Sequence, residues 1–250
     1  LEYCQNKKIT LFGVSAKYID HLKNEKFNSH GLDLSSLKII TSTGSPLAEE
    51  SFKYVHENIK EDVHLSSIAG GTDMVGCLVL GNLYSAVYRG EIQGQSLGID
   101  VDVFTENGMS AKVGEKGELV VKQPFPSMPV KFWGDVSDEK YHKAYFTRFN
   151  NIWHHGDFIE RTTNNGFIMS GRSDTTLNPG GVRIGTSEIY QQVENVDFIT
   201  EGLVVGQNYN NDIRIVLFIT TKDNIEIDEE KIKLIKLKIR KNCSPKHVPS

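Results

Sequence analysis

The chain has 250 residues, 38% of them hydrophobic and 24% charged, and a formal net charge of −4, which is typical of a soluble globular protein of one or two domains. So small a net charge gives no reason to expect a nucleic-acid partner, because binding to nucleic acid requires a basic face. No apolar run approaches the roughly 20 residues that a membrane-spanning helix needs, so no membrane partner is expected either.

The early part of the chain alternates between strand and helix patterns. Residues 37–43 (LKIITST) predict a short buried strand, and residues 63–68 (VHLSSI) predict the next one. Between them we expect a helix that runs to about Lys60, with Ser45 as its cap and Pro46 at its first position. This strand–helix–strand order predicts a parallel sheet.

Glycine turns follow both predicted strands, one at Gly44 and one at Gly70-Gly71. Ligands of parallel sheets bind beyond the carboxyl ends of the strands, so the two turns share one neighbourhood if the strands are close in the sheet. After the second turn, the Thr72 hydroxyl and the glycine amides could hold a phosphate, and Asp73 could hold Mg²⁺, which prefers hard oxygen ligands. A capped helix start is the competing interpretation of this segment.

From residue 98 the pattern becomes β-rich. The segment GIDVDVFTENG (98–108) alternates and ends in Asn107-Gly108, which is a strong signal for a hairpin turn. Further strands are predicted over residues 117–123, 152–160 and 166–170. The sequence therefore predicts a β-rich subdomain after the parallel sheet.

The pattern changes again after Arg172, and we predict a first domain over residues 1–173 and a second over residues 174–250. Asp228 is placed to cap a final helix that has acids early and bases late, as the helix dipole favours. The predicted elements of the second domain are a helix over 186–196, strands over 203–206 and 214–220, and a helix over 228–241.

The stretch from Trp153 to Glu188 combines an isolated acid, Asp157, with Arg172, Arg183 and the glycine turn Gly180-Gly181. A carboxylate can hold the two hydroxyls of a ribose, and guanidinium groups bind phosphate oxygens in bidentate fashion. This ordered combination indicates a nucleotide monophosphate site. The competing interpretation is three ordinary surface turns.

Three cysteines, Cys4, Cys77 and Cys243, are widely spaced and form no CxxC pair. A disulfide framework or zinc knuckle is therefore not expected. We expect instead a reducing, cytoplasmic location. His154 and His155 have no further ligand set nearby in the sequence, so a zinc site there is not expected either.

Taken in order, four segments resemble the adenylate-forming (acyl-CoA synthetase) superfamily, and most of all its acetoacetate–CoA ligases. The resemblance is carried by FGVSAKYI (12–19), TSTGSPL (41–47), WHHGD (153–157) and GRSDTTLNPGGVRIGTSEIY (171–190). It implies an α/β fold: the later part of the large AMP-binding domain, with its parallel sheet and β-rich subdomain, followed by a small mobile α+β domain that is incomplete at its end.

The resemblance also implies a two-step reaction on acetoacetate, ATP and coenzyme A. In the first step the carboxylate attacks the α-phosphate of ATP in the presence of Mg²⁺, which gives an acyl-adenylate and pyrophosphate. The small domain then rotates, and the thiol of coenzyme A displaces AMP.

Residue by residue, the resemblance assigns adenine and adenylate contacts in the first domain. The adenine pocket would be formed by Gly44, Ser45 and Pro46. Residues 67–72, including Gly70 and Gly71, would wrap the adenylate, with Thr72 on its phosphate. Asp73 would be the metal-binding acid, where many relatives have Glu.

The remaining implied roles concern the ribose, the phosphate, the hinge and coenzyme A. They are Asp157 on the ribose hydroxyls, Arg172 on ribose or phosphate, Asp174 as the hinge, Arg183 on phosphate, Gly180 and Gly181 beside the pantetheine chain, and Arg240 at the nucleotide end of coenzyme A.

The chain departs from the family pattern in two respects. Relatives that act on acetate have tryptophans where this chain has Ala69 and Gly70, so a deeper acyl pocket is expected, and Gly70→Trp should shift the preference toward acetate. The upstream phosphate loop and the downstream catalytic lysine of the family are not among these residues. The chain is therefore expected to be a fragment that does not adenylate by itself.

Three alternatives stay open. One is a ligase for another short acid, such as propionate or butyrate. Another is a catalytically inactive nucleotide-binding module, and the most remote is a β-rich interaction domain without a ligand.

Overall fold

The structure, a computed structural model, describes residues 1–177, 179, 182, 184–210, 212–222 and 225–250. It divides into two compact units, Leu1–Met169 and Ser170–Ser250, and each is described by itself. The predicted domain boundary, after residue 173, lies four residues beyond this division. That Asp174 acts as a hinge between the two domains stays a prediction.

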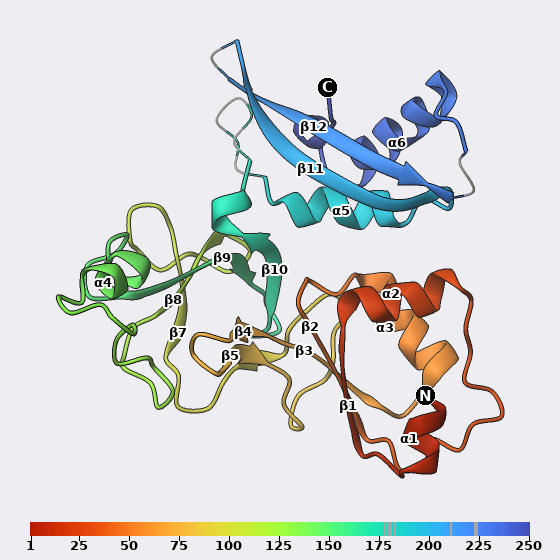
Figure 1. Cartoon of the computed structure of the whole chain (residues 1–250), viewed down its shortest axis with the longest axis horizontal. Coiled ribbons are helices and arrows are strands. Elements are labelled where there is room, and N and C mark those ends of the chain that lie inside the picture. Colours follow the sequence, from red (N-terminus) through yellow and green to blue (C-terminus); the bar gives the residue numbers. More distant parts are fainter. Residues whose placement is uncertain (178, 180–181, 183, 211, 223–224) are drawn as a thin grey trace. The chain divides into compact units, whose positions relative to one another are not determined.

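The first unit begins with a three-stranded parallel sheet (Figure 1). The parallel pairing of its second and third strands was predicted, whereas its first strand and the two helices before residue 37 were not. Its strands lie in the order β1-β2-β3, and helices connect them by strand–helix–strand links. Buried Leu37, Phe52 and Leu65 belong to the hydrophobic core of this region. The elements are α1 (Glu2–Asn6), β1 (Leu11–Ser15), α2 (Ala16–Asn24), β2 (Ile39–Thr43), α3 (Glu49–Tyr54), a π-helical turn (Val55–Ile59) and β3 (His64–Ser67).

The predicted start of α3 was wrong. The helix begins at Glu49 after Ala48, without a side-chain cap, so Ser45 is not its cap and Pro46 is not in its first turn. Leu47 and Ala48 are buried in the first unit, and burying this apolar pair keeps the chain extended for a few residues more. The acids at the new helix start suit the helix dipole.

The segment after β3 is also different from its prediction. Residues 69–71 form strand β4 (Ala69–Gly71) rather than a turn. This strand pairs with β5 (Gly76–Leu80), which in turn pairs with β6 (Gly94–Gln95), and both pairs are antiparallel. Gly70 and Gly71 therefore pair with β5 as part of a strand, and the predicted glycine turn is not formed there.

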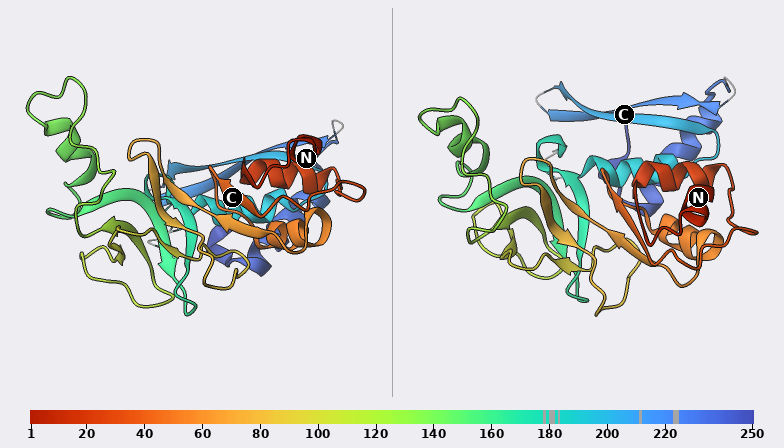
Figure 2. Two further views of the ribbon diagram at one scale, coloured as in Figure 1. Left: turned by 90° about the horizontal axis from the view of Figure 1, so that it is seen from below. Right: turned by 60° about the horizontal axis from the view of Figure 1, so that its bottom comes forward.

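A four-stranded sheet in the order β10-β9-β8-β7 forms the β-rich region. The hairpin at Asn107-Gly108 is confirmed: the Thr105 amide donates to the Met109 carbonyl at 2.8 Å, and Gly108 has a φ of +73°. One helix, α4, was not predicted; it lies on the long connection between β8 and β9, green in Figures 1 and 2. The elements are β7 (Val101–Phe104), β8 (Lys116–Val121), α4 (Glu139–Tyr145), β9 (Trp153–Arg161) and β10 (Phe167–Arg172).

The second unit pairs two long antiparallel strands, β11 and β12, with two helices, α5 and α6. All four elements occur where they were predicted, although the strands are longer. The Asp228 side chain accepts from the Lys231 amide at 2.9 Å, which confirms the predicted cap of α6. The elements are a 3-10 turn (Ser173–Thr175), α5 (Thr186–Glu194), β11 (Ile199–Tyr209), β12 (Asp212–Thr221), α6 (Glu229–Asn242) and a second 3-10 turn (Pro245–His247).

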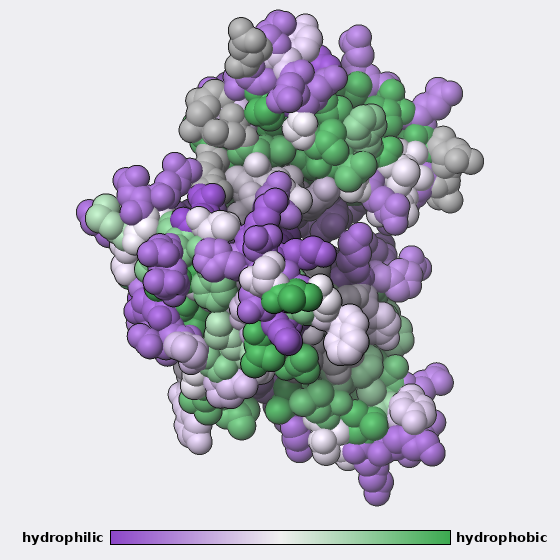
Figure 3. Space-filling model, turned by 60° about the vertical axis from the view of Figure 1, so that its left-hand side comes forward, coloured by the Kyte–Doolittle hydropathy of each residue, from purple (hydrophilic) through white to green (hydrophobic). Residues whose placement is uncertain are grey.

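The two faces of the β11–β12 pair differ in burial. Val204 and Ile215 are buried in the core of the second unit. Leu203 and Phe218, which are partners in the register, are more than half exposed, and hydrophobic surface is visible on this unit in the upper part of Figure 3. Alternation along each strand explains why neighbouring positions differ in this way. Within the described ranges, no helix is long and apolar enough to cross a membrane.

Candidate nucleotide site

The carboxyl ends of β2 and β3 lie side by side in the first unit. Ser42 and Ser67 are register partners, and the Ile68 amide donates to the Ser42 carbonyl at 2.9 Å. The segments that follow, with Gly44 and Gly70-Gly71, therefore leave neighbouring strand ends, as the sequence predicted. A parallel sheet binds its ligands at this edge.

Gly44 is required by the backbone at the end of β2. Its φ is +86°, a conformation that side chains disfavour, and a Cβ there would meet no atom within 4 Å. Gly44 and Ser45 are exposed, so the adenine of a nucleotide could reach them. The neighbouring Ser42 hydroxyl is buried, and the described residues offer it no hydrogen-bond partner.

The glycines of β4 are packed against neighbouring atoms. A Cβ on Gly70 would lie 2.1 Å from the carbonyl oxygen of Gly76 and 2.5 Å from the Cα of Cys77. Both contacts are with backbone, so Gly70→Trp cannot be made without displacing β5. The expected shift of preference toward acetate in Gly70→Trp stays a prediction, and it now includes a displacement of β5.

Asp73 folds back over the second glycine. A Cβ on Gly71 would lie 2.0 Å from Oδ1 of Asp73 and 3.1 Å from Cε1 of His155. The other carboxylate oxygen, Oδ2, accepts a hydrogen bond of 2.5 Å from the Tyr145 hydroxyl. Thr72 and Asp73 are both exposed, so the predicted phosphate and metal ligands are accessible.

Asp157 lies on β9 and is 8% exposed. Its Oδ2 lies 3.8 Å from Nε2 of His155, and Nδ1 of His155 lies 3.3 Å from the indole nitrogen of Trp153. The Trp153 ring is stacked on Tyr145, with centroids 3.7 Å apart and an angle of 11° between the planes. The two acids of the predicted site are thus the ends of one array of side chains, Asp73–Tyr145–Trp153–His155–Asp157.

Sequence reasoning missed Tyr145 and His155. Tyr145 is 72 positions from Asp73 and lies on the unpredicted helix α4. His155 was considered only as a zinc ligand; among the described residues there is no group of three or more acids, histidines and cysteines that could hold a metal. The spacing of His155 and Asp157 on one strand face was the available signal.

The donors at Asp73 suit Mg²⁺ better than zinc. Mg²⁺ is usually held by one or two carboxylates together with substrate phosphates. Asp73 supplies one exposed carboxylate, beside Thr72 and the backbone of β4. The residues therefore fit a magnesium–nucleotide complex.

In the second unit, the predicted hinge is a short 3-10 turn, Ser173–Thr175. Nε of Arg172 lies 3.6 Å from Oδ1 of Asp174, and both side chains are more than half exposed. The hydroxyls of Thr175 and Thr176 donate to the Arg172 carbonyl at 3.0 and 3.2 Å. Short element-terminal segments of this kind can absorb the rotation of a domain.

The start of α5 is fixed by Glu188. Its Oε1 accepts from the Gly185 amide at 3.0 Å, and its Oε2 lies 3.3 Å from Nε2 of His247. These contacts secure the carboxyl side of the predicted glycine loop, of which Gly180, Gly181 and Arg183 lie outside the described residues.

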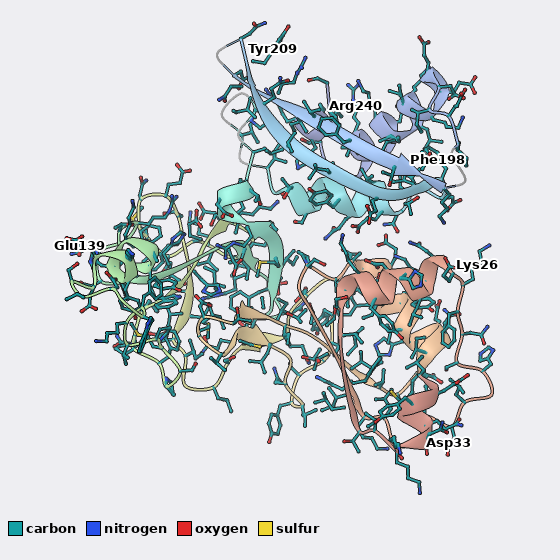
Figure 4. All side chains as sticks on the ribbon, in the orientation of Figure 1. Lys26, Asp33, Glu139, Phe198, Tyr209 and Arg240 are labelled. Carbon is teal, nitrogen blue, oxygen red and sulfur yellow. The ribbon has the colours of Figure 1, made fainter. Side chains whose placement is uncertain are left out.

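Arg240 lies near the end of α6 (Figure 4). It lines a surface groove of about 480 Å³ together with Lys233 and Lys236. Several apolar side chains share the groove, among them Leu237. Glu229 also lines the groove. Because three cations outnumber this one acid, the groove suits a phosphorylated ligand such as the nucleotide end of coenzyme A.

The structure therefore brings together only some of the predicted residues. Thr72, Asp73 and Asp157 belong to the first unit, whereas Arg172 and Arg240 belong to the second. That the acid Asp157 and the arginines meet on one nucleotide stays a prediction.

Comparison with known proteins finds relatives along the whole chain. It is 52% identical over 250 residues to an acetoacetyl-coenzyme A synthetase of Rhizobium meliloti, covering 100% of this chain and 38% of that protein. It is 43% identical over 247 residues to an acetoacetyl-CoA synthetase of Xenopus tropicalis, covering 97% of this chain and 36% of that protein. The chain thus spans little more than a third of the length of these relatives. A search of family models found no match.

Solved structures give the same result. An acetoacetyl-CoA synthetase from Streptomyces lividans superposes with a TM-score of 0.90 at 35% identity, covering 99% of this chain and 38% of that one. An anthranilate CoA ligase in complex with anthranoyl-AMP superposes with a TM-score of 0.81, but at 18% identity it shows the fold alone. Over its whole length, the chain is therefore similar in both sequence and fold to acetoacetyl-CoA synthetases of the adenylate-forming superfamily.

Proposed function

We propose that the protein carrying this chain is an acetoacetate–CoA ligase. It would activate acetoacetate with ATP as an acyl-adenylate and transfer the acyl group to coenzyme A, releasing AMP. The observation that carries this proposal is the similarity of the whole chain to acetoacetyl-CoA synthetases, at 52% and 43% identity. The substrates are small molecules, and a cytoplasmic location is proposed with them.

The first step would use the residues of the first unit. Asp157 would accept hydrogen bonds from the ribose hydroxyls, and the exposed Thr72 hydroxyl would donate to a phosphate oxygen. Asp73 would hold Mg²⁺, which, when bound, offsets the negative charge that grows on the phosphate oxygens during in-line displacement. Gly44, Ser45 and Pro46 would border the adenine.

The second step would use the residues of the second unit. Rotation about Asp174 would exchange the surfaces that face the adenylate, so that the loop with Gly180, Gly181 and Arg183 meets the pantetheine chain and the phosphate. Arg172 would contact the ribose or the phosphate. The groove at Arg240 supports a place for the nucleotide end of coenzyme A, because it presents three cations on one helix.

The test is ATP–pyrophosphate exchange by the whole protein with acetoacetate, acetate, propionate and butyrate as separate substrates. We expect acetoacetate to give the highest kcat/KM. Preference for propionate or butyrate would replace the proposed substrate and keep the reaction. Binding of AMP without exchange on any acid would instead identify an inactive nucleotide-binding module.

A further inference from the structure

We propose that Tyr145 is a positioning residue for Asp73, and that the array through Trp153 and His155 sets Asp73 relative to Asp157. The inference rests on the proposed function, because it takes Asp73 and Asp157 as the acids at the two ends of one nucleotide. Every contact of the array lies inside the first unit.

The Tyr145 hydroxyl fixes one oxygen of an otherwise exposed carboxylate. It donates to Oδ2 of Asp73 at 2.5 Å, while Oδ1 is directed over Gly71. An exposed acid has several rotamers, and holding one of them removes an entropy cost from metal binding. The hydroxyl also leaves Oδ1 as the oxygen that lies beside Gly71 of β4.

Tyr145 is itself held by its surroundings. The residue is 9% exposed, and its ring stacks on Trp153, which is 2% exposed. Phe132 and Tyr141 meet the same ring edge-on, at 5.8 and 5.5 Å between centroids. This packing restricts the rotamers of Tyr145 and directs its hydroxyl to Asp73.

The same tryptophan connects the array to the second acid. Its indole nitrogen donates to Nδ1 of His155 at 3.3 Å, and Nε2 of His155 lies 3.8 Å from Oδ2 of Asp157. A donor bond at Nδ1 leaves the ring proton of neutral His155 on Nε2, where it faces the acid. The array therefore connects the two carboxylates through residues of the first unit alone.

Tyr145→Phe in the whole protein tests this role, with Tyr141→Phe as the matched control. Tyr141 lies on the same helix α4, which begins at Glu139 in Figure 4, but its hydroxyl donates to the Pro129 carbonyl. The probe is Mn²⁺ with ATP, with bound metal measured by electron paramagnetic resonance. We expect Tyr145→Phe to weaken Mn²⁺–ATP binding about tenfold, as loss of an outer-shell partner does, and Tyr141→Phe to change it less than about twofold.

Two further measurements separate positioning from a general folding defect. Affinity for AMP in EDTA should be unchanged in Tyr145→Phe, since Asp157 keeps His155. In an Asp73→Asn background, Tyr145→Phe should have no further effect on Mn²⁺–ATP binding, because the two residues act as a unit.

Equal losses in the Tyr145 and Tyr141 variants, or a full Tyr145 effect without the Asp73 carboxylate, would overturn the inference. So would an Asp73→Asn variant with unchanged Mn²⁺–ATP affinity. The proposed reaction is judged separately: a wild-type protein that shows the expected metal response but no acetoacetate-dependent exchange would refute the proposed substrate and retain the role of Tyr145.

Discussion

Close contacts with single neighbouring atoms decide whether a glycine near β4 can be replaced by a larger residue. A Cβ on Gly70 would lie 2.1 Å from a backbone oxygen of β5. A Cβ on Gly94 of β6 would meet only the side-chain nitrogen Nδ2 of Asn82, at 3.7 Å. The packing of the sheet thus excludes a side chain at Gly70 but leaves space for one at Gly94. The acyl-pocket interpretation of Gly70 has to include the cost of moving a strand.

Gly70→Ala is expected to destabilise the protein by about 1–3 kcal/mol, as overpacking against backbone does. Gly94→Ala is the matched control and should change the free energy of unfolding by less than about 1 kcal/mol, because its new methyl group has space. Urea unfolding of both variants measures the difference. Equal free energies of unfolding for the two variants would contradict the prediction, because β5 would then move away from residue 70 without a cost in stability.

Asp157→Asn keeps the shape of the side chain and removes its charge. If Asp157 accepts from both ribose hydroxyls, the wild-type protein should bind ATP about tenfold more tightly than 2′-deoxy-ATP, a difference of about 1.4 kcal/mol. The variant should lose most of this preference, because the amide replaces one acceptor by a donor. Calorimetric titration with both nucleotides measures it, and an unchanged preference would remove Asp157 from the ribose.

At the scale of elements, one buried acid connects three strands of the β-rich sheet. Oδ1 of Asp102 on β7 lies 3.2 Å from Arg161 of β9, and Oδ2 lies 3.3 Å from Lys122, which follows β8. The Ser110 hydroxyl donates to Oδ2 at 2.6 Å. Burial by itself would raise the pKa of Asp102, but the hydrogen bonds from Ser110 and Val103 and the charge of Lys122 outweigh it and lower the pKa.

Asp102→Asn tests this network through the pH dependence of stability. A lowered pKa in the folded state stabilises the protein fully above the unfolded value of about 3.9, and this contribution is lost as the pH falls through the folded pKa. The variant should be less stable than wild type at pH 7, and the difference should narrow below about pH 4. Chemical unfolding at a series of pH values gives both curves, and parallel curves would contradict the assignment.

Elements with local signals could be predicted from the sequence. The cap Asp228, the hairpin at Asn107-Gly108 and the parallel pair of β2 and β3 are confirmed, since each has a signal in a short stretch of the chain. The start of α3 could not be predicted, because burial of Leu47 and Ala48 overrides the local Ser-Pro signal. Nor could the bond from Tyr145 to Asp73, which joins residues 72 positions apart.

At the scale of the molecule, the two units carry different parts of the predicted site. Asp73 and Asp157 are fixed within the first unit, and Arg172 and Arg240 lie in the second. The proposed ligase reaction would require both units to meet the same nucleotide in turn. A domain rotation about a short turn at Asp174 is compatible with that requirement.

The 250-residue chain by itself is expected to give no acetoacetate-dependent ATP–pyrophosphate exchange. The phosphate loop and the catalytic lysine that the family resemblance implies are not among its residues, and it covers 38% of the length of the Rhizobium meliloti relative. The whole protein, assayed in parallel, is the control. Clear turnover by the isolated chain would show that these groups are dispensable.

The central claim is that Asp157, Arg172 and Arg183 bind one AMP moiety. A crystal structure of the whole protein with AMP and acetoacetate tests it most directly. The account predicts that the Asp157 carboxylate accepts from both ribose hydroxyls and that the two arginines contact the same ribose or phosphate. A nucleotide bound away from Asp157, or arginines that no rotation about Asp174 can bring to it, would contradict the account.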